Sequence, residues 1–281
     1  TYVGALEAAM AVTAHPYGYT DLMGVSGLAF RLRWYDAPEQ KWCPSSAVGE
    51  GAAEAAAIAK ATGWQSRAIL FEDWENPNVG RYADQITAAV DAGLPVVTYD
   101  DGLNCATIYG YENGGDKLHI RTYFDKAAPV ARDISKVGPM LEFLEDYTEP
   151  MRPREAIEAS LRIAVDHWAA ERGAWSVDRY LYGQAAYDRW FAHLDSMSEM
   201  PPDELDGFRD VSLWNYGSLV DARREAAAYL LRATDGLTGE ARAAVTRAGG
   251  IYRAEHDLLH EAGNLEGDLM PRLRAVLEQA A

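Results

Sequence analysis

The chain has 281 residues, of which 48% are hydrophobic and 25% are charged, and its formal net charge at pH 7 is −17. This length and composition are typical of a globular protein with one large or two modest domains, and no apolar run approaches the roughly 20 residues of a membrane helix. The negative charge repels phosphate groups, so we expect neither nucleic acid nor an anionic membrane as a partner.

The first half of the chain predicts short helices followed by a sheet. Helical composition and apolar spacing predict helices over 4–12, 20–32, 50–63 and 78–93. Apolar and β-branched runs predict strands over 67–73, 94–99, 105–111 and 117–124. An Asn-Gly-Gly sequence between the last two strands is typical of a hairpin turn. The residues up to about 150 therefore predict an α+β domain with a mainly antiparallel sheet.

Beyond Pro150 and Pro153 nearly every pattern is helical. Ile157, Leu161, Val165 and Trp168 fall at helical spacing and predict one buried stripe. Further helices are predicted over 176–194, 218–236, 240–264 and 268–280. About five helices would then form a bundle or cap. We therefore divide the chain into an α+β domain over 1–150 and an all-α domain over 151–281.

The order of elements in the first half resembles a known fold. An early apolar helix is followed by further helices and by a sheet that is entered through "GLPVV…YGYENG". This stretch resembles the strand, turn and strand "G-x-P-V…GYD-x-G" of papain-like proteins, over roughly residues 1–125. The resemblance is to bacteriocin-processing cysteine peptidases and, more strongly, to the family of butirosin biosynthesis protein H. That family is related to acyltransferases and has a helical region after its papain-like half.

The resemblance implies a nucleophile, a base and an orienting residue. In the family, a cysteine at the N-terminus of the early helix is the nucleophile, and a histidine at a strand entry is the base. Here "SGLAF" places Ser26 in the position of the cysteine, and a shift of three places Met23 there. Asn104 and Cys105 stand where the histidine is expected. Both positions depart from the family pattern.

Other residues offer alternatives for the same chemistry. His15 lies in a predicted loop before the 20–32 helix and could act as a base. His119 alternates with Leu118 and Ile120, so it faces solvent or a cleft. Each candidate also has a structural interpretation: Ser26 as a small packing residue, and Cys105 as a small buried apolar residue.

The sequence predicts no metal or cofactor site. His256 and His260 have the i, i+4 spacing of metal ligands, but no third ligand is evident. Asp100 and Asp101 are adjacent, which suits a turn better than an acid–base pair. No phosphate-binding glycine motif occurs.

The cysteines and the start of the chain point to a cellular compartment. Two cysteines, Cys43 and Cys105, are too few for a disulfide framework, and the sequence starts without the basic region of a signal peptide. We expect reduced thiols and a cytoplasmic protein.

Two functions remain open at this point. The first is an acyl transferase, or an ester or amide hydrolase, acting on a small molecule near Ser26 with His15, His119, Asn104 or Cys105 as partners. The second is a non-catalytic papain-fold protein that binds a small molecule or a partner protein in a cleft between its domains. Tyrosine and tryptophan are abundant in both halves and suit such a cleft. A homodimer is compatible with either function.

Overall fold

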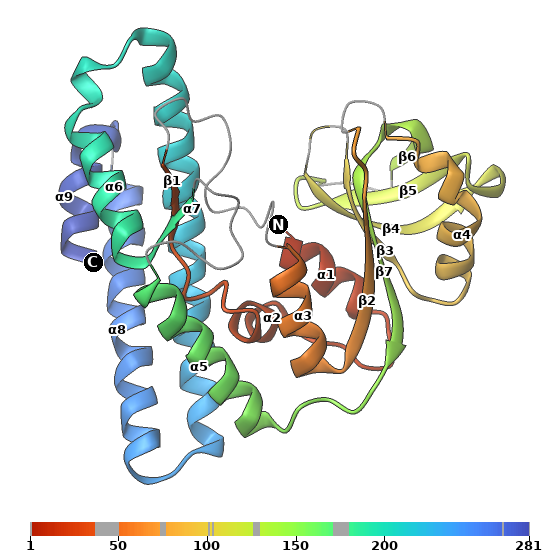
Figure 1. Ribbon diagram of the computed structural model, residues 1–281, viewed down its shortest axis with the longest axis horizontal. Coiled ribbons are helices and arrows are strands. Elements are labelled where there is room, and N and C mark those ends of the chain that lie inside the picture. The colour runs from red at the N-terminus through yellow and green to blue at the C-terminus, as the bar shows by residue number, and fades with distance from the viewer. Residues whose placement is uncertain are drawn as a thin grey trace. The chain divides into compact units, whose positions relative to one another are not determined.

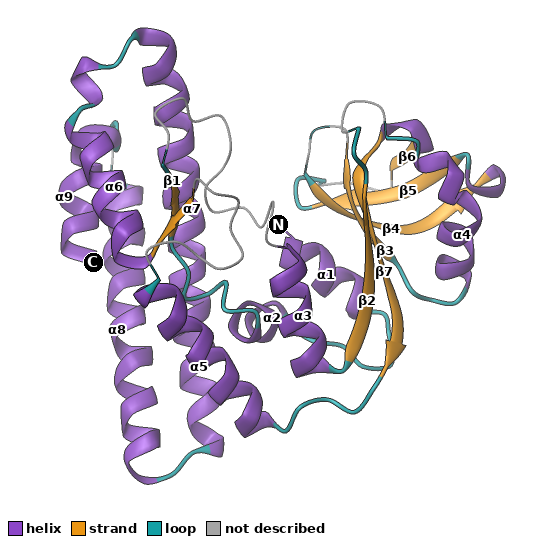
Figure 2. Ribbon diagram, in the orientation of Figure 1, coloured by secondary structure: helices purple, strands orange, loops and turns teal. Residues whose placement is uncertain are grey.

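A computed structural model describes residues 2–36, 51–73, 77–100, 102, 104–125, 130–170, 180–265 and 267–280. The contacts within it divide the chain into two compact units, which are drawn in Figures 1 and 2. Unit 1 comprises Thr1–Leu22 and Ala55–Met151, and unit 2 comprises Met23–Glu54 and Arg152–Ala281. One division falls after Met151, and the sequence analysis divides the chain after Pro150. The segment Met23–Glu54, which the sequence places in the N-terminal domain, belongs to the helical unit.

Unit 1 is built on a six-stranded antiparallel sheet (Figure 2). The strand order is β2-β7-β3-β4-β5-β6. The strands are β2 (Trp64–Leu70), β3 (Val96–Asp100), β4 (Cys105–Glu112), β5 (Lys117–Thr122), β6 (Val130–Asp133) and β7 (Val137–Tyr147). The predicted hairpin is confirmed between β4 and β5, where Asn113 and Gly114 take the positive φ values of 51° and 68° that such a turn requires.

Two helices cover the sheet of unit 1, α1 (Tyr2–Met10) and α4 (Ala83–Asp91). Ile86 of α4 packs into the core with Ala106 and Ile108 of β4. Thr107 points to the opposite face, where its hydroxyl donates to the carbonyl oxygen of Ala5 in α1 at 2.9 Å. The early helix buried against this sheet is therefore α1.

The sequence missed two strands of this sheet, β6 and β7. Val137–Leu144 of β7 is buried at every position, because β7 lies inside the sheet between β2 and β3. A strand buried on both faces lacks the apolar–polar alternation by which a strand is recognised.

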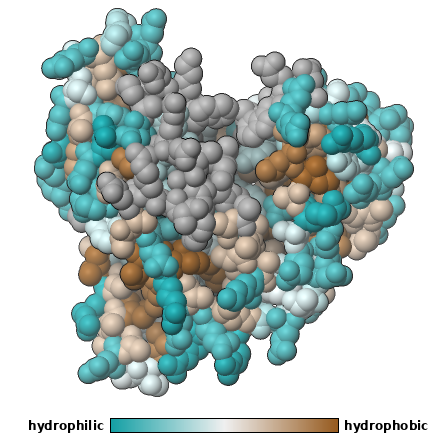
Figure 3. Space-filling view, viewed as in Figure 1, coloured by the Kyte–Doolittle hydropathy of each residue, from teal (hydrophilic) through white to brown (hydrophobic). Residues whose placement is uncertain are grey.

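Unit 2 contains the five helices that the sequence predicts, counted over its described residues. They are α5 (Pro153–Ala169), α6 (Gly183–Asp195), α7 (Pro202–Ala233), α8 (Gly239–Asn264) and α9 (Met270–Ala280). The predicted fold class, α+β followed by a helical C-terminal part, is confirmed. Hydrophilic residues occupy much of the face drawn in Figure 3. No helix within the described ranges has both the length and the apolarity to cross a bilayer.

Unit 2 also contains a two-stranded ribbon, whose second strand the sequence analysis assigned to a helix. β1 (Arg33–Tyr35) pairs antiparallel with β8 (Tyr180–Tyr182). Trp34 and Leu181 face the core of the bundle, where the Trp34 ring stacks on Trp190 at 4.7 Å. The predicted helix over 176–194 therefore begins only at Gly183. Pairing partners about 145 residues apart cannot be recognised from local pattern.

Two further helix predictions need correction. The predicted 20–32 helix is the short α2 (Tyr19–Val25), and α3 (Gly51–Thr62) matches its prediction; both helices contribute residues to both units. In α5 the predicted stripe is confirmed at Ile157, which is buried, and is wrong at Val165 and Trp168, which are 65% and 48% exposed. The other buried residues of α5 are Ser160 and His167.

Candidate functional site

Ser26 lies at the wrong end of a helix for the predicted chemistry. It follows the last residue of α2, and Gly27 ends the helix with a φ of +80°. Its hydroxyl, in a residue that is 1% exposed, donates to the carbonyl of Met23 at 3.2 Å and accepts from the amide of Leu28 at 3.3 Å. The C-terminal end of a helix carries partial negative charge, which repels an oxyanion. The placement of Ser26 at a helix N-terminus was therefore wrong.

Asn104 and Cys105 lie together where β4 begins in unit 1. The backbone amide of Asn104 donates to Asp100 Oδ1 at 2.8 Å, and the amide of Asp100 donates to the carbonyl of Asn104 at 2.9 Å. Asn104 thus closes the turn between β3 and β4. Cys105 is buried and shares a strand face with Thr107, the face toward α1. Asp101 and Cys43 lie outside the described residues.

The two candidate histidines of unit 1 lie apart from that thiol. The exposed ring of His15 stacks on Tyr147 at 3.6 Å. His119 Nε2 lies 2.9 Å from Glu112 Oε1, and its strand position opposes Gly110. Gly110 is five residues along β4 from Cys105, or about 17 Å. Cys105 and His119 therefore do not form a nucleophile–base pair, while Ser26 belongs to unit 2.

A cluster of buried polar residues in unit 2 is the more distinctive feature of the structure. The His167 cluster, as we name it, consists of Arg31, Arg33, Glu54, His167 and Tyr182, all of them buried. Arg31 forms an ion pair with Glu54 of α3. The Tyr182 ring lies 5.6 Å from the imidazole of His167. Charged groups are rarely buried without a structural or functional reason, because their desolvation is costly.

The cluster is held in place by three neighbouring elements. Arg33 stands directly opposite Tyr182 in the ribbon, on the face that points away from Trp34. Gly27 abuts α5 so closely that an added Cβ would lie 2.3 Å from Ile163 and 3.7 Å from His167. The backbone beside Arg31 is fixed from α7, where Arg223 donates to the carbonyls of Ala29 and Arg31 at 3.3 and 3.5 Å.

The electrostatics of the cluster keep its histidine neutral. Burial, together with the positive charges of Arg31 and Arg33, lowers the pKa of His167 from 6.5 to about 4. At neutral pH the imidazole therefore carries one N–H donor and one acceptor. The hydroxyl of Tyr182 has no hydrogen-bond partner among the described residues, and the side chain is 0% exposed.

These residues escape detection from the sequence for a simple reason. The predicted helix over 20–32 assigns Arg31 to solvent. The predicted apolar stripe on α5 assigns His167 to solvent. The available signal is the alternation in "RLRWY" and "YLY", which has the two-residue period of strands.

Two other buried carboxyl groups are accounted for by their own neighbours. In unit 1, burial raises the pKa of the Glu142 carboxyl, which accepts hydrogen bonds from Ser66 at 2.6 Å and from Tyr2 at 3.0 Å. In unit 2, Glu255 accepts from Arg223 at 2.7 Å and from Tyr187 at 3.3 Å. Both carboxyl groups therefore have hydrogen-bond partners within the protein.

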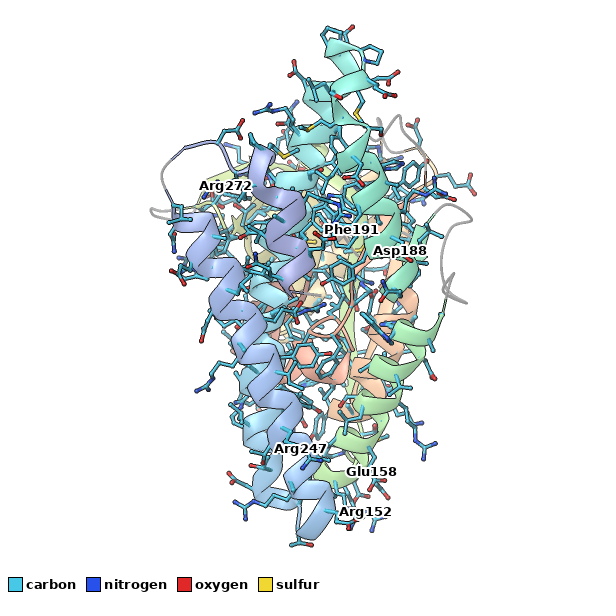
Figure 4. The ribbon with its side chains drawn as sticks, turned by 90° about the vertical axis from the view of Figure 1, so that its left-hand side faces the viewer. Arg152, Glu158, Asp188, Phe191, Arg247 and Arg272 are labelled. Atoms are coloured by element: carbon cyan, nitrogen blue, oxygen red, sulfur yellow. The ribbon has the colours of Figure 1, made fainter. Side chains whose placement is uncertain are left out.

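A pocket of about 370 Å³ lies at the start of α5 in unit 2. It is lined by Arg152, Arg154, Glu155 and Glu158 at the start of α5; Figure 4 labels Arg152 and Glu158 there, with Arg247 of α8 toward the same end. Arg152 pairs with Glu155, and Arg154 pairs with Glu158 at 2.9 Å. Ion pairs between exposed neighbours on one helix are an ordinary surface feature.

The histidine pair noted in the sequence lies on α8. The rings of His256 and His260 stack at 5.4 Å on α8. Asp257 lies beside His256, and Asn264 beside His260. No group of three or more metal-ligating side chains occurs among the described residues.

Comparison with known proteins adds no family assignment. Neither a family model nor a curated protein matches this sequence.

Proposed function

We propose that this protein is a non-catalytic binding protein of papain-like architecture, and that its ligand is a small molecule. A single observation carries the proposal. Ser26, the residue that the resemblance aligns with the nucleophile, follows the C-terminal end of α2, and both of its hydroxyl's hydrogen bonds go to the local backbone. The other candidate nucleophile, Cys105, is buried and five residues along the strand from the position opposite His119.

The papain-like part of the proposal rests on unit 1. In that unit the helix α1 is buried against the middle of an antiparallel sheet, and this packing supports the proposal. The proposal includes a cytoplasmic location, which the low cysteine content favours.

The binding part of the proposal rests on unit 2. The His167 cluster contains cationic, neutral and hydroxyl donors that are withdrawn from solvent. Buried polar groups that converge at one place are typical of ligand sites. They also commonly cost stability, which proteins accept where function requires it.

The experiment that separates binding from catalysis is covalent labelling of the native protein. We expect a fluorophosphonate probe and iodoacetamide to label Ser26 and Cys105 no faster in native than in unfolded protein, by intact mass and peptide mapping. Ser26→Ala and Cys105→Ala serve as site controls. Two results together would overturn the proposal. One is rapid stoichiometric labelling of a residue in the native protein, where unfolding abolishes the rapid reaction. The other is turnover of an activated ester or thioester.

A further inference from the structure

We propose that His193 is a pH-sensitive latch in unit 2, which holds the β1–β8 ribbon against α6 while its imidazole is neutral and releases the ribbon when the imidazole is protonated. The latch requires no bound ligand, so it goes beyond the proposed binding function.

The latch is a hydrogen bond between the ribbon and α6. The indole Nε1 of Trp34 in β1 donates to Nδ1 of His193, in the last turn of α6, at 2.9 Å. An indole N–H can only donate, so Nδ1 must be without a proton when this bond forms. In an imidazolium both ring nitrogens carry protons, and two N–H groups would then face each other. Protonation of His193 therefore breaks the bond.

The indole cannot turn away when the bond breaks. Trp34 is completely buried, stacks on Trp190 of α6 at 4.7 Å and meets the Phe208 ring of α7 edge-on at 6.1 Å. His193 is partly exposed, so its charged ring can turn toward water. The indole N–H would then remain in the core without an acceptor, which is a costly state. A movement of β1 away from α6 relieves this cost.

The charged groups around the latch come from α6, from the segment after β1 and from α9. Arg189 of α6 and Asp36 after β1 both act on the imidazole, and they pair with each other at 2.9 Å. On α9, which also packs against α6, Arg274 pairs with Asp195 at 3.1 Å. The side chain that α7 places beside the imidazole is the uncharged Phe208, at 6.3 Å.

These surroundings set the direction of the switch. Burial lowers the pKa of His193 below 6.5, the positive charge of Arg189 lowers it further, and the negative charge of Asp36 opposes both effects. The imidazole is therefore neutral at pH 7, where the hydrogen bond is present. The bond is lost as the pH falls through the lowered pKa.

The ribbon also carries part of the His167 cluster. Arg33 and Tyr182 stand opposite each other on the face of the ribbon that points away from Trp34. Release of Trp34 in mild acid therefore loosens the element that bears these two residues.

Nuclear magnetic resonance of the full chain follows the indole N–H of Trp34 directly. We expect its resonance to shift as the pH falls from 7 to 5, with an inflection below pH 6.5. The backbone amides of β1 and β8 should exchange with solvent about tenfold faster at pH 5 than at pH 7, relative to their intrinsic rates. The far-ultraviolet circular dichroism should not change, because the helices remain folded.

Two variants assign the response to its residue. In His193→Asn the carboxamide oxygen can accept from Trp34 at either pH, so both the shift and the faster exchange should disappear. His167→Gln is the matched control, because it removes a second buried histidine of unit 2 and leaves the latch intact. It should respond as the wild type does.

Three outcomes overturn the inference. A Trp34 resonance that does not move between pH 7 and pH 5 shows that Nδ1 stays without a proton. A shift that persists in His193→Asn assigns the titration to another group. A shift without faster exchange in β1 and β8 shows that the hydrogen bond does not hold the ribbon.

Discussion

Ser26 and His167 illustrate how the environment of a side chain decides its chemistry. Both residue types are common in active sites, yet only Ser26 stands out in the sequence, through its two flanking glycines. In the folded protein its hydroxyl forms hydrogen bonds to the backbone at the C-terminal end of α2. His167 lies in an unremarkable helical sequence, but burial and two arginines change its proton affinity. The local sequence motif therefore draws attention to Ser26 and misses His167, whose chemistry the fold changes more.

The lowered pKa of His167 predicts a loss of stability in acid. The folded pKa of about 4 lies below the ordinary 6.5, so between these values the unfolded chain binds a proton that the folded chain does not. The contribution to the free energy of unfolding is fully present above pH 6.5 and falls as the pH drops toward 4. It amounts to about 2 kcal/mol between pH 7 and pH 5.

Urea denaturation at pH 7 and pH 5, followed by the helical signal, measures this effect. Between the two pH values, the free energy of unfolding of His167→Gln should fall by about 2 kcal/mol less than that of the wild type. His15→Gln, at an exposed position, should lose as much as the wild type. Equal losses in His167→Gln and the wild type would contradict the prediction.

A close glycine contact joins α7 of unit 2 to the end of α2. An added Cβ on Gly24 would lie 2.2 Å from the Tyr229 ring of α7, a separation that no packed atom tolerates. By contrast, an added Cβ on Gly217 of α7 would meet nothing within 4 Å. Close packing therefore requires glycine at position 24 in α2, whereas position 217 in α7 has room for a side chain.

These two glycines make a matched pair of substitutions. Gly24→Ala should lower the free energy of unfolding by about 1–3 kcal/mol, because the methyl group must displace an aromatic ring. Gly217→Ala should raise it by about 0.5–1 kcal/mol, since alanine is the better helix former. Urea denaturation of both variants is the measurement. A Gly24→Ala variant as stable as the wild type would show that α2 does not pack against α7 in this way.

The helical unit as a whole depends on residues from early in the chain. Leu32 and Trp34 belong to the core of the bundle, and Trp34 is completely buried. The buried guanidinium of Arg223 donates to the backbone of Ala29 and Arg31. The C-terminal helices alone would therefore have a hole in their core and a buried cation without those acceptors.

Residues 152–281 expressed alone should consequently not form a stable bundle. Loss of a buried tryptophan from a core costs about 3–5 kcal/mol, and an unpaired buried charge costs more. We expect a broad thermal transition and a weak near-ultraviolet circular dichroism signal, compared with the full chain. A fragment that melts cooperatively at the temperature of the full chain would refute this dependence.

Local pattern was sufficient wherever a segment's structure depends on its own residues. The Ala-rich run that forms α3, the apolar spacing of α8 and the Asn-Gly-Gly hairpin turn each carry their own period or turn chemistry. From these follow the α+β class, the five C-terminal helices and most of the sheet. Tertiary contacts decided the rest: the ribbon of β1 and β8, the fully buried β7, and the polar buried face of α5. None of the His167 cluster was foreseen, because its members come from four distant segments and owe their burial to one another.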